Sequence, residues 1–372
     1  MLLLMAASCS CRGPRQAWQG QGTAIAFSHA RLIHVEDCDS FRLVTIDNPW
    51  KRGTTLHRYI LLPRDASMPA ALPEGTIVRT PLSRSVVFTS VHCALISELQ
   101  AEQQVAGVAD LKYIKVPFVQ QGVQQRRLID CGDGMSPVIE KIIDAQADAI
   151  LLSPFENAGG YGRLEDIDIP IIECAEYMEP TPLARAEWMR FYGMLYGQEQ
   201  RADSLFQEVE RRYHEQQQLA SQAGGRPSVV LDKMAGSVWY VPGGRSTIGQ
   251  MLSDAQCDYP WADNSDGGSL QLSFEAVLER AGHCQYWILR YDSRDTLTMN
   301  ALLSERDGYR MMQAVADNQV YACNVSTSMF YEETPFRPDL LLQDFIHILH
   351  PDIPNLPPLR YYHKMRDELL EQ

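Results

Sequence analysis

The sequence predicts an α/β protein with two similar lobes joined by one long helix, and three observations lead to this prediction. Segments that alternate between strand and helix patterns fill much of the chain before residue 181. A long helical stretch follows over residues 181–225, and the strand–helix alternation then starts again. A chain of 372 residues is also too long for one ordinary hydrophobic core, so two domains are expected.

The chain begins with a short apolar segment, MLLLMAASC, in which small residues directly precede Cys9. This segment resembles a bacterial lipoprotein signal, whose cysteine becomes the lipidated first residue. The resemblance implies a lipid anchor at Cys9 on a bacterial membrane, with Cys11 as the second candidate, although the usual basic start of such a signal is missing. The alternative is a disordered tail without function. Residues 1–22 are therefore assigned to a signal and tether.

Residues 23–180 form the predicted first lobe. Its first part consists of short segments that alternate with period two, and Asp, Asn and Pro separate these segments. This pattern predicts a small sheet or β-meander ahead of the α/β pattern. The next elements alternate between strand and helix, so a parallel sheet is expected. They are a strand at 85–90, a helix at 91–108, a helix at 136–147, and strands at 148–154 and 170–175.

The stretch 181–225 predicts two connecting helices. Thr181 is a candidate N-cap with Pro182 at the first helical position, and two glycines separate a helix ending near Tyr196 from one starting at Gln198. About 24 residues at 1.5 Å rise make a rod of roughly 35 Å, which we interpret as a rigid strut. Its apolar stripe comprises Ala202, Leu205, Phe206, Val209, Tyr213, Gln216 and Ala220.

Residues 226–372 repeat the α/β plan as a second lobe. Strands and helices again alternate, and a closing helix ends near His350. The expected elements are a strand at 228–234, a loop running into a helix at 238–255, a helix at 274–284, a strand at 285–291, a helix with a short strand at 312–323, and the closing helix at 337–353.

Composition excludes several classes of protein. The formal net charge of -14 argues against a general nucleic-acid binder, and no apolar run approaches the length of a membrane span. Seven cysteines beyond the N-terminal tail are widely scattered, without a C-x-x-C pair or a cysteine–histidine cluster. They are expected to be mostly small buried hydrophobes.

Several segments taken together resemble one family of binding proteins. In the first half they are VVFTSVHCALISELQAEQQVAGV and IEKIIDAQADAILLSP; the connecting stretch TPLARAEWMRFYGMLYGQEQRADSLFQEVERRY matches as well. In the second half they are VWYVPGGRSTIGQMLSDAQCDYPWAD, SLQLSFEAVLERAGHCQYWI and RPDLLLQDFIHILHPDI. This set, spanning roughly residues 85–353, is similar to the periplasmic substrate-binding proteins of ABC importers for siderophore-bound iron, haem and cobalamin, in their Bacteroidetes-type branch.

The resemblance implies a class III periplasmic binding protein with two Rossmann-like lobes and a single long backbone helix. It implies a protein that is not an enzyme, has no cofactor, and binds a ferric siderophore, haem or cobalamin. Its implied partners are the permease and ATPase subunits of an ABC transporter in the membrane, and its implied location is the periplasm.

A binding protein of this fold holds its ligand between the lobes, where flat side chains and cations suit a macrocycle or a catecholate. Arginines and aromatic residues follow several predicted strands, and their alternatives are core packing for the aromatics and local ion pairs for the arginines. The candidates in the second lobe are Trp239, Tyr240, Arg245, Trp261, Arg290 and Tyr291. Those in the first lobe are Ser90, His92, Tyr161 and Arg163, with Phe155 in the same loop as the last two.

His92 offers two further possibilities. It could ligate haem iron or corrin cobalt, although a histidine satisfied at a helix N-terminus is commoner, and no cluster for a bare metal ion is expected. A tetrapyrrole metal chelatase on a related fold is the alternative function, but it needs a carboxylate partner for this histidine, and none is evident from the sequence. A lipoprotein adhesin or partner-binding scaffold without a closed pocket is the third hypothesis.

In this family an acidic residue on each lobe docks to arginines of the permease. The resemblance assigns this role to Glu275 in LSFEAVL and to Glu156 in the first lobe, with Glu165 as the next candidate there. The alternative for each is an ordinary solvated glutamate.

Overall fold

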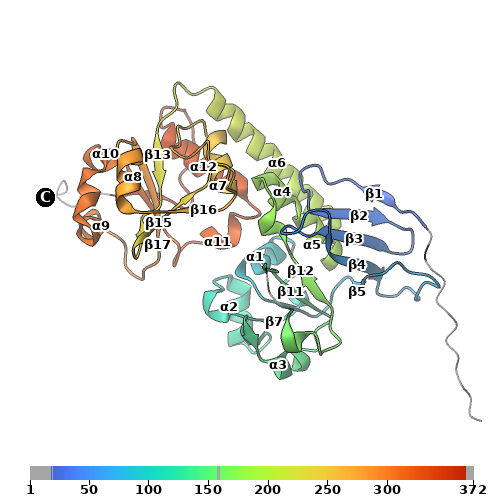
Figure 1. The fold of residues 1–372 in the computed structure, drawn as a ribbon. Coiled ribbons are helices and arrows are strands. Elements are labelled where there is room, and N and C mark those ends of the chain that lie inside the picture. The colour runs from blue at the N-terminus through green and yellow to red at the C-terminus, as the bar shows by residue number, and fades with distance from the viewer. Residues whose placement is uncertain (1–17, 19, 157–159, 366–372) are drawn as a thin grey trace, which may run out of the picture.

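The computed structural model describes residues 18, 20–156 and 160–365, so Cys9 and Cys11 lie outside the described residues. Figure 1 shows an N-terminal sheet, a first lobe, connecting helices and a second lobe in chain order. Among the described residues, no helix combines the length and apolar character needed to cross a membrane. The two α/β lobes on either side of one long helix confirm the predicted fold class.

The N-terminal sheet has five strands in chain order, which confirms the predicted sheet ahead of the first lobe. The first four strands pair antiparallel, and the fifth joins the fourth in parallel. The strands are β1 (Thr23–Ile25), β2 (Ile33–Asp37), β3 (Arg42–Asp47), β4 (Thr55–Pro63) and β5 (Thr76–Thr80).

The first lobe is built on a parallel sheet of strand order β12-β11-β6-β7-β8. Its strands are β6 (Ser85–Val87), β7 (Val105–Val108), β8 (Ile129–Asp130), β11 (Ala149–Leu152) and β12 (Ile171–Glu173). Its helices are α1 (Ser90–Glu98), α2 (Pro117–Gln124) and α3 (Ile139–Asp144), with short helices η1 (Glu102–Gln104), η2 (Leu111–Tyr113) and η3 (Gly162–Leu164). A small hairpin joins β9 (Gly132–Asp133) to β10 (Ser136–Pro137).

Two helices of the first lobe are shorter in the structure than predicted. The helix expected over 91–108 ends at Glu98, and its last four residues form the buried strand β7. The helix expected over 136–147 starts at Ile139, because residues 136–137 pair in the hairpin. In both cases strand pairing outweighs a local helical pattern.

The N-terminal sheet is fastened to the edge of the first lobe by one tyrosine. Tyr59 of β4 is fully buried; its hydroxyl donates to the carbonyl of Ile171 at 3.1 Å and accepts from the N–H of Glu173 at 2.8 Å. Both partners belong to β12, the edge strand of the parallel sheet. Tyr59 therefore covers exposed backbone groups that would otherwise invite pairing with another chain.

The connecting stretch starts its helices at Thr181 and divides at Gly197 as predicted, but the first predicted helix is split in two at Trp188. Thr181 caps α4 (Pro182–Glu187) by accepting from the N–H of Ala184 at 3.1 Å, after a short turn η4 (Glu176–Met178). Next comes α5 (Met189–Tyr196), which ends at Gly197 with a φ of 68°, and glycine adopts that value without strain.

The long helix α6 (Glu199–Ser221) is the predicted strut. Its 23 residues give a length of about 35 Å at 1.5 Å per residue. It packs on α5 and on the closing helix of the second lobe, and Figure 1 shows it running along both. Its buried positions confirm most of the predicted stripe: Ala202, Phe206, Val209, Tyr213 and Ala220.

The second lobe has a parallel sheet β13-β17-β18, with β19 added antiparallel, and a separate antiparallel sheet β14-β15-β16. The strands are β13 (Val229–Leu231), β14 (Met234–Ala235), β15 (Val238–Pro242), β16 (Ser269–Leu272), β17 (Tyr286–Tyr291), β18 (Val320–Asn324) and β19 (His363–Lys364). The helices are α7 (Thr247–Asp254), α8 (Phe274–Ala281), α9 (Met299–Glu305), α10 (Gln313–Ala316), α11 (Phe330–Glu333) and α12 (Pro338–Leu349), with the short η5 (Asp307–Met311). The expected loop at 238–242 is therefore the strand β15.

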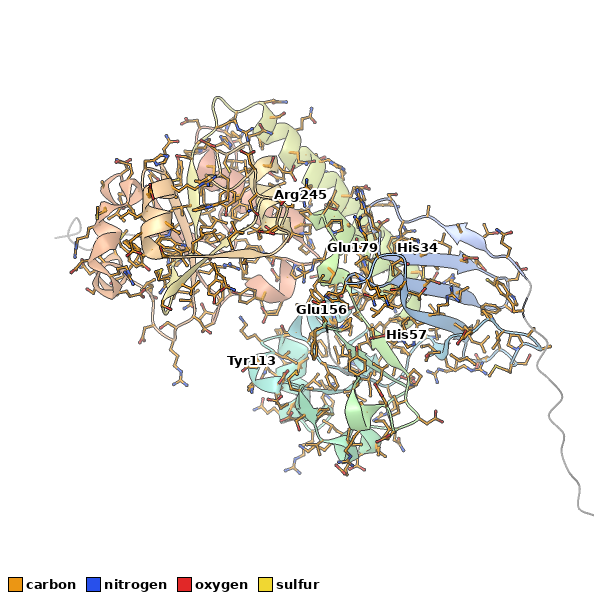
Figure 2. All side chains as sticks on the ribbon, in the orientation of Figure 1. His34, His57, Tyr113, Glu156, Glu179 and Arg245 are labelled. Atoms are coloured by element: carbon orange, nitrogen blue, oxygen red, sulfur yellow. The ribbon has the colours of Figure 1, made fainter. Side chains whose placement is uncertain are left out.

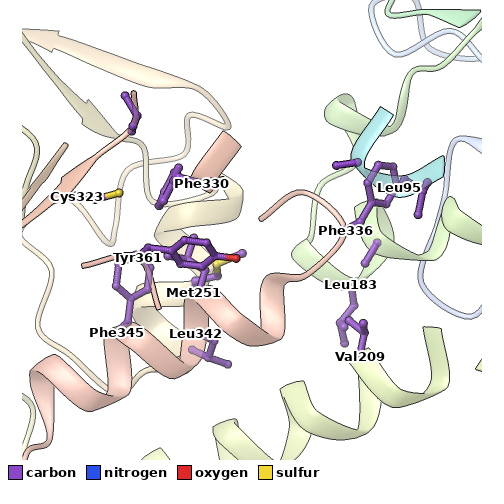
Figure 3. Packing of buried hydrophobic residues seen from close by; sticks show 14 of the residues in the cluster. Leu95, Leu183, Val209, Met251, Cys323, Phe330, Phe336, Leu342, Phe345 and Tyr361 are labelled. Carbon is purple, nitrogen blue, oxygen red and sulfur yellow. The ribbon is translucent and has the colours of Figure 1, made fainter. Parts of the chain in front are cut away.

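One hydrophobic core runs from the N-terminal sheet through both lobes. Figure 3 shows Phe336 of the second lobe close to Leu95 of α1 and Leu183 of α4. The seven cysteines of the described residues are free thiols, and all but Cys38 are buried, which confirms their expected role as small hydrophobes. Burial raises the pKa of the Cys131 thiol to about 12, so this thiol stays protonated and unreactive.

Candidate functional site

Residues that follow the carboxyl ends of β7 and β18 meet at the boundary between the lobes. Lys115, in the loop after β7, donates through Nζ to the carbonyl of Ser328 at 2.6 Å and also contacts the carbonyl of Val325. Val325 and Ser328 follow β18 of the second lobe. Ligands of open α/β sheets bind outside the carboxyl ends of strands, so this boundary is where a ligand cleft is expected.

Lys115 also lies 3.6 Å from Glu332, measured between Nζ and Oε1. Burial raises the pKa of the Glu332 carboxyl, whereas Lys115 opposes this shift. The two lobes are therefore joined by a lysine that places a positive charge beside a partly desolvated carboxylate.

A pocket of about 500 Å³ opens at the carboxyl edge of the first lobe. It is formed by residues after β6, β7 and β11, so three neighbouring strands converge on it. Apolar and aromatic side chains line it together with a few polar groups. The lining residues are Phe88, Thr89, Asp110, Gly134, Met135, Ser136, Pro137, Ile139, Leu152, Ser153, Phe155, Gly160, Tyr161, Gly162, Arg163 and Leu164.

Tyr161 is the most firmly positioned aromatic residue of this pocket. Its hydroxyl donates to Oε1 of Glu173 at 2.6 Å. The other oxygen of Glu173 lies 2.9 Å from Nδ1 of His57, which stacks on Tyr59 with ring centroids 4.4 Å apart. Burial, followed by the contact with Glu173, raises the pKa of Tyr161, so the hydroxyl remains a neutral donor. The N-terminal sheet, which carries His57 (Figure 2), therefore helps to hold a pocket residue.

Two further residues of the same loop region are accessible. The side chain of Arg163 is 71% exposed, and its contact with Glu140 at 3.3 Å is a surface ion pair. Such a pair is weak, so the guanidinium can turn toward an anionic ligand. Phe155 is 45% exposed at the pocket rim. The structure thus brings the predicted pair Tyr161 and Arg163 together with Phe155 in one pocket.

The second lobe presents an aromatic residue near this boundary that the sequence analysis missed. Tyr331 of α11 is 48% exposed and belongs to the segment 325–332 that touches Lys115. The guanidinium of Arg290 lies 5.8 Å from the Tyr331 ring centroid and 5.5 Å from that of Phe330. The sequence signal that could have revealed Tyr331 is the aromatic pair Phe330-Tyr331, which follows the short strand predicted within 312–323.

Arg290 itself forms the local ion pair that was the alternative to a ligand contact. Its Nε and Nη2 atoms lie 2.8 and 2.5 Å from the two carboxylate oxygens of Asp232. Burial would lower the pKa of Arg290, but the bidentate contact with Asp232 outweighs it and raises that pKa. The charge of Arg290 is therefore already compensated by Asp232.

Comparison with known proteins identifies the family of this two-lobed chain. The profile of a family described as periplasmic binding proteins matches residues 91–326, which is more than half of the chain. The chain belongs to this periplasmic binding protein family. The family consists of solute-binding proteins, and it places the chain outside the cytoplasm.

Individual relatives agree with this assignment. An uncharacterized lipoprotein of Methanocaldococcus jannaschii is 23% identical over 313 residues, covering 80% of this chain and 73% of its own length. A periplasmic haem-binding protein from Pseudomonas aeruginosa superposes with a TM-score of 0.58 at 16% identity, covering 77% of this chain and 98% of its own. An ABC-type Fe³⁺-hydroxamate transport protein from Saccharomonospora viridis superposes with a TM-score of 0.55 at 19% identity. The match covers 82% of this chain and 97% of the other. The fold is that of class III periplasmic binding proteins.

Trp239 does not line the cleft of this periplasmic binding protein, contrary to the expectation from its sequence. It is fully buried on β15, and its indole N–H donates to the carbonyl of Leu231 at 2.8 Å. Its ring stacks near Phe274 and Trp287, with centroids 6.3 and 5.9 Å apart. Trp239 is a core residue of the second lobe, because β15 turns this side chain toward the parallel sheet.

Two other aromatic candidates of the second lobe are also packing residues. Trp261 is buried against Tyr259, with ring centroids 5.6 Å apart, and lies under Arg280. Tyr291 is buried at the end of β17. The expectation that Trp261 and Tyr291 contact ligand is therefore not met in this structure.

Tyr240 and Arg245 are exposed but lie away from the pocket described above. The carbonyl of Arg245 accepts from Gln250 at 3.1 Å, and the same amide contacts Pro180, just ahead of α4. Arg245 is therefore on the side of the second lobe next to the connecting helices, as Figure 2 shows. Tyr240 lies on β15 among the antiparallel strands.

His92 is sealed inside the first lobe, so it is not accessible to a chelate in the cleft. Its Nε2 lies 3.3 Å from Oε1 of Glu176, and both side chains are almost fully buried. Glu176 is thus an acidic partner of His92, and it was not evident from the sequence because it lies 84 residues away in the chain. Ser90 is half-buried at the start of α1, beside the pocket residue Thr89.

The two glutamates assigned to permease docking are both exposed. Glu275 lies in the first turn of α8, whose N-cap is Ser273. Glu156 follows Phe155, and Figure 2 shows it on the side of the first lobe that is turned toward the second lobe and the connecting helices. Their docking role stays a prediction.

Proposed function

We propose that this periplasmic binding protein captures a metal chelate, such as a ferric siderophore, haem or cobalamin, and delivers it to the permease of an ABC importer. The family supports solute binding, and the haem-binding and Fe³⁺-hydroxamate neighbours support a chelated metal as the solute. The partners are then the permease and ATPase subunits. Glu156 and Glu275 are the residues that we assign to permease docking.

The pocket at the carboxyl edge of the first lobe carries this proposal. Its volume of about 500 Å³ is within the range of small-molecule sites. Phe155 and Tyr161 supply flat surfaces for a macrocycle or a catecholate ring, and Arg163 supplies a fork of donors for anionic oxygens. From the second lobe, we assign the exposed Tyr331 to the opposite side of the ligand.

The chelatase alternative has less support from the structure. A chelatase needs a base that reaches the pyrrole nitrogens in the cleft. His92 and Glu176 form the required kind of pair, but 0% and 2% of their side chains are exposed. The role that fits the described residues best is therefore binding without catalysis.

Alanine substitutions at the two accessible aromatic residues test the proposed site. We expect Phe155→Ala and Tyr331→Ala each to weaken binding of the preferred chelate by roughly 5- to 150-fold, since each removes about 1–3 kcal/mol of stacking contact. The measurement is a titration of the purified protein with haemin, a ferric catecholate, a ferric hydroxamate and cyanocobalamin. The absorption spectrum of the protein as purified shows which of these classes it carries from the cell.

Tyr240→Ala is the matched control, because Tyr240 is an exposed aromatic residue outside the pocket. The Tyr240→Ala variant is expected to bind the preferred chelate with the affinity of the unmodified chain. Unchanged binding in both Phe155→Ala and Tyr331→Ala would place the ligand elsewhere. Weaker binding in Tyr240→Ala alone would favour the site first suggested by the sequence.

We further propose that Cys9 anchors the protein to the membrane through a lipid. The lipoprotein relative and the small residues before Cys9 support this proposal. Expressed with its full N-terminus, the protein should partition into detergent, whereas Cys9→Ser should be soluble or uncleaved. Cys11→Ser is the control and should behave like the unmodified chain; loss of the membrane fraction in this variant alone would assign the lipid to Cys11.

A further inference from the structure

Two histidines and a glutamate meet where the N-terminal sheet contacts the connecting helix α6. They are His29, in the loop between β1 and β2, and Glu210 and His214 on α6. One possible ligand atom from each residue lies within 4.8 Å of the other two. The cluster belongs neither to the cleft nor to the first-lobe pocket, and the transport function proposed above does not use it.

The backbone that carries His29 is held firmly in place. The buried carboxylate of Glu187 accepts from the N–H groups of Ser28, His29 and Ala30 at 2.7, 2.7 and 2.8 Å. Glu179, labelled in Figure 2 at this contact, accepts in the same way from the next two N–H groups of the chain. The loop therefore presents its side chains to α6 in a defined position, which lowers the entropic penalty of binding an ion.

The three side chains are oriented toward one another by their neighbours. Nε2 of His29 lies 2.6 Å from Oε1 of Glu210, and the imidazole ring contacts the edge of Phe206 at a centroid distance of 5.9 Å. Glu210 and His214 are four residues apart, so they share one face of the helix. Nδ1 of His214 lies 2.8 Å from the amide oxygen of Gln217. That contact leaves Nε2 of His214 as the ligand atom, which is the usual arrangement around a metal-bound imidazole.

We propose that His29, Glu210 and His214 bind a divalent transition-metal ion of the Zn²⁺ type. Two imidazoles and a carboxylate are a ligand set that such ions prefer, and the half-exposed position leaves a fourth site for water. The ion takes the place of the hydrogen bond between Nε2 of His29 and Glu210, because this nitrogen must be free of its proton to coordinate a metal.

Only small movements are needed to form this site. Ligand atoms about 2.0–2.2 Å from a tetrahedral ion lie roughly 3.4 Å from one another. The contact between His29 and Glu210 must therefore open slightly from 2.6 Å, and the widest separation must close from within 4.8 Å. Rotation of the exposed His214 side chain supplies most of this change. The bound ion then fastens the N-terminal sheet to the strut.

Zinc titration of the metal-free full chain tests the proposal. Calorimetry with ZnCl₂ is expected to show one bound ion in the reference protein, and affinity should fall at least about tenfold in His214→Ala and in Glu210→Gln. Cys9 and Cys11 are replaced by serine in every sample, so that thiols of the tail do not compete for the ion. Zinc should also raise the Tm of the reference protein but not that of His214→Ala.

His34→Ala is the matched control. His34 lies on β2 of the same sheet and pairs with Asp47 at 3.0 Å, but no second histidine joins this pair among the metal-ligand groupings of the described residues. This variant should bind zinc as the reference protein does. Absence of zinc binding in the reference protein, or full binding in His214→Ala, would overturn the proposal. His214 is exposed on the helix, so its replacement leaves a folded chain, and circular dichroism verifies this.

Discussion

Replacing Trp239 with alanine should lower the free energy of unfolding by about 3–5 kcal/mol, the usual range for removing a large buried aromatic side chain. Trp239 is fully buried among Phe274, Trp287 and Tyr309, so its loss leaves a cavity that these neighbours cannot close. The carbonyl of Leu231 also loses the indole N–H that it accepts. Equilibrium unfolding in urea, followed by far-UV circular dichroism, measures the change.

Tyr240→Ala controls for the effect of any aromatic-to-alanine change on the same strand. Tyr240 is the next residue of β15 and is 42% exposed, because neighbouring side chains on a strand point to opposite faces. Its replacement should change the free energy of unfolding by less than about 1 kcal/mol. If the two variants were equally stable, Trp239 would not have the core role that we assign to it.

Replacing Glu187 with alanine should lower the free energy of unfolding by roughly 3–5 kcal/mol, although alanine is the better helix former. The fully buried carboxylate accepts three backbone N–H groups of the loop 28–30 and lies 3.2 Å from Arg190. Without it, three backbone donors and the Arg190 guanidinium lose a charged partner in a partly desolvated place. Urea unfolding measures the free energy, and amide hydrogen exchange measures the loss of protection at residues 28–30.

Glu215→Ala is the matched control for this prediction. Glu215 lies on α6, and its carboxylate pairs with Arg211 at 2.6 Å, but its side chain is 58% exposed. Surface pairs of this kind add little to stability, so a change within about 0.5 kcal/mol is expected. Equal losses in the two variants, or unchanged exchange at residues 28–30 in Glu187→Ala, would show that Glu187 does not anchor the loop.

The sequence determined those features of the fold that depend on residues close together in the chain. Thr181 and Pro182 start the connecting helices and Gly197 separates them, since helix caps and positive-φ glycines act within one turn. The apolar stripe of α6 followed from a period of 3.6 residues, and the alternation of strands and helices determined the two-lobed α/β fold. Tyr161 and Arg163 were predicted for a similar reason, because their loop follows the strand β11, and both line the pocket of the first lobe.

The tertiary structure alone decided which of the candidate side chains are accessible and which are buried. Trp239 turned inward because β15 pairs with β14 and β16, and residues from different loops supply these partners. Arg290 is neutralised by Asp232 over a separation of 58 residues, and His29 meets Glu210 over 181. Such contacts depend on strand register and on the packing of distant segments, neither of which has a local pattern in the chain. The sequence by itself therefore determined the architecture of this protein, whereas the packing of distant segments decided which side chains its surface presents.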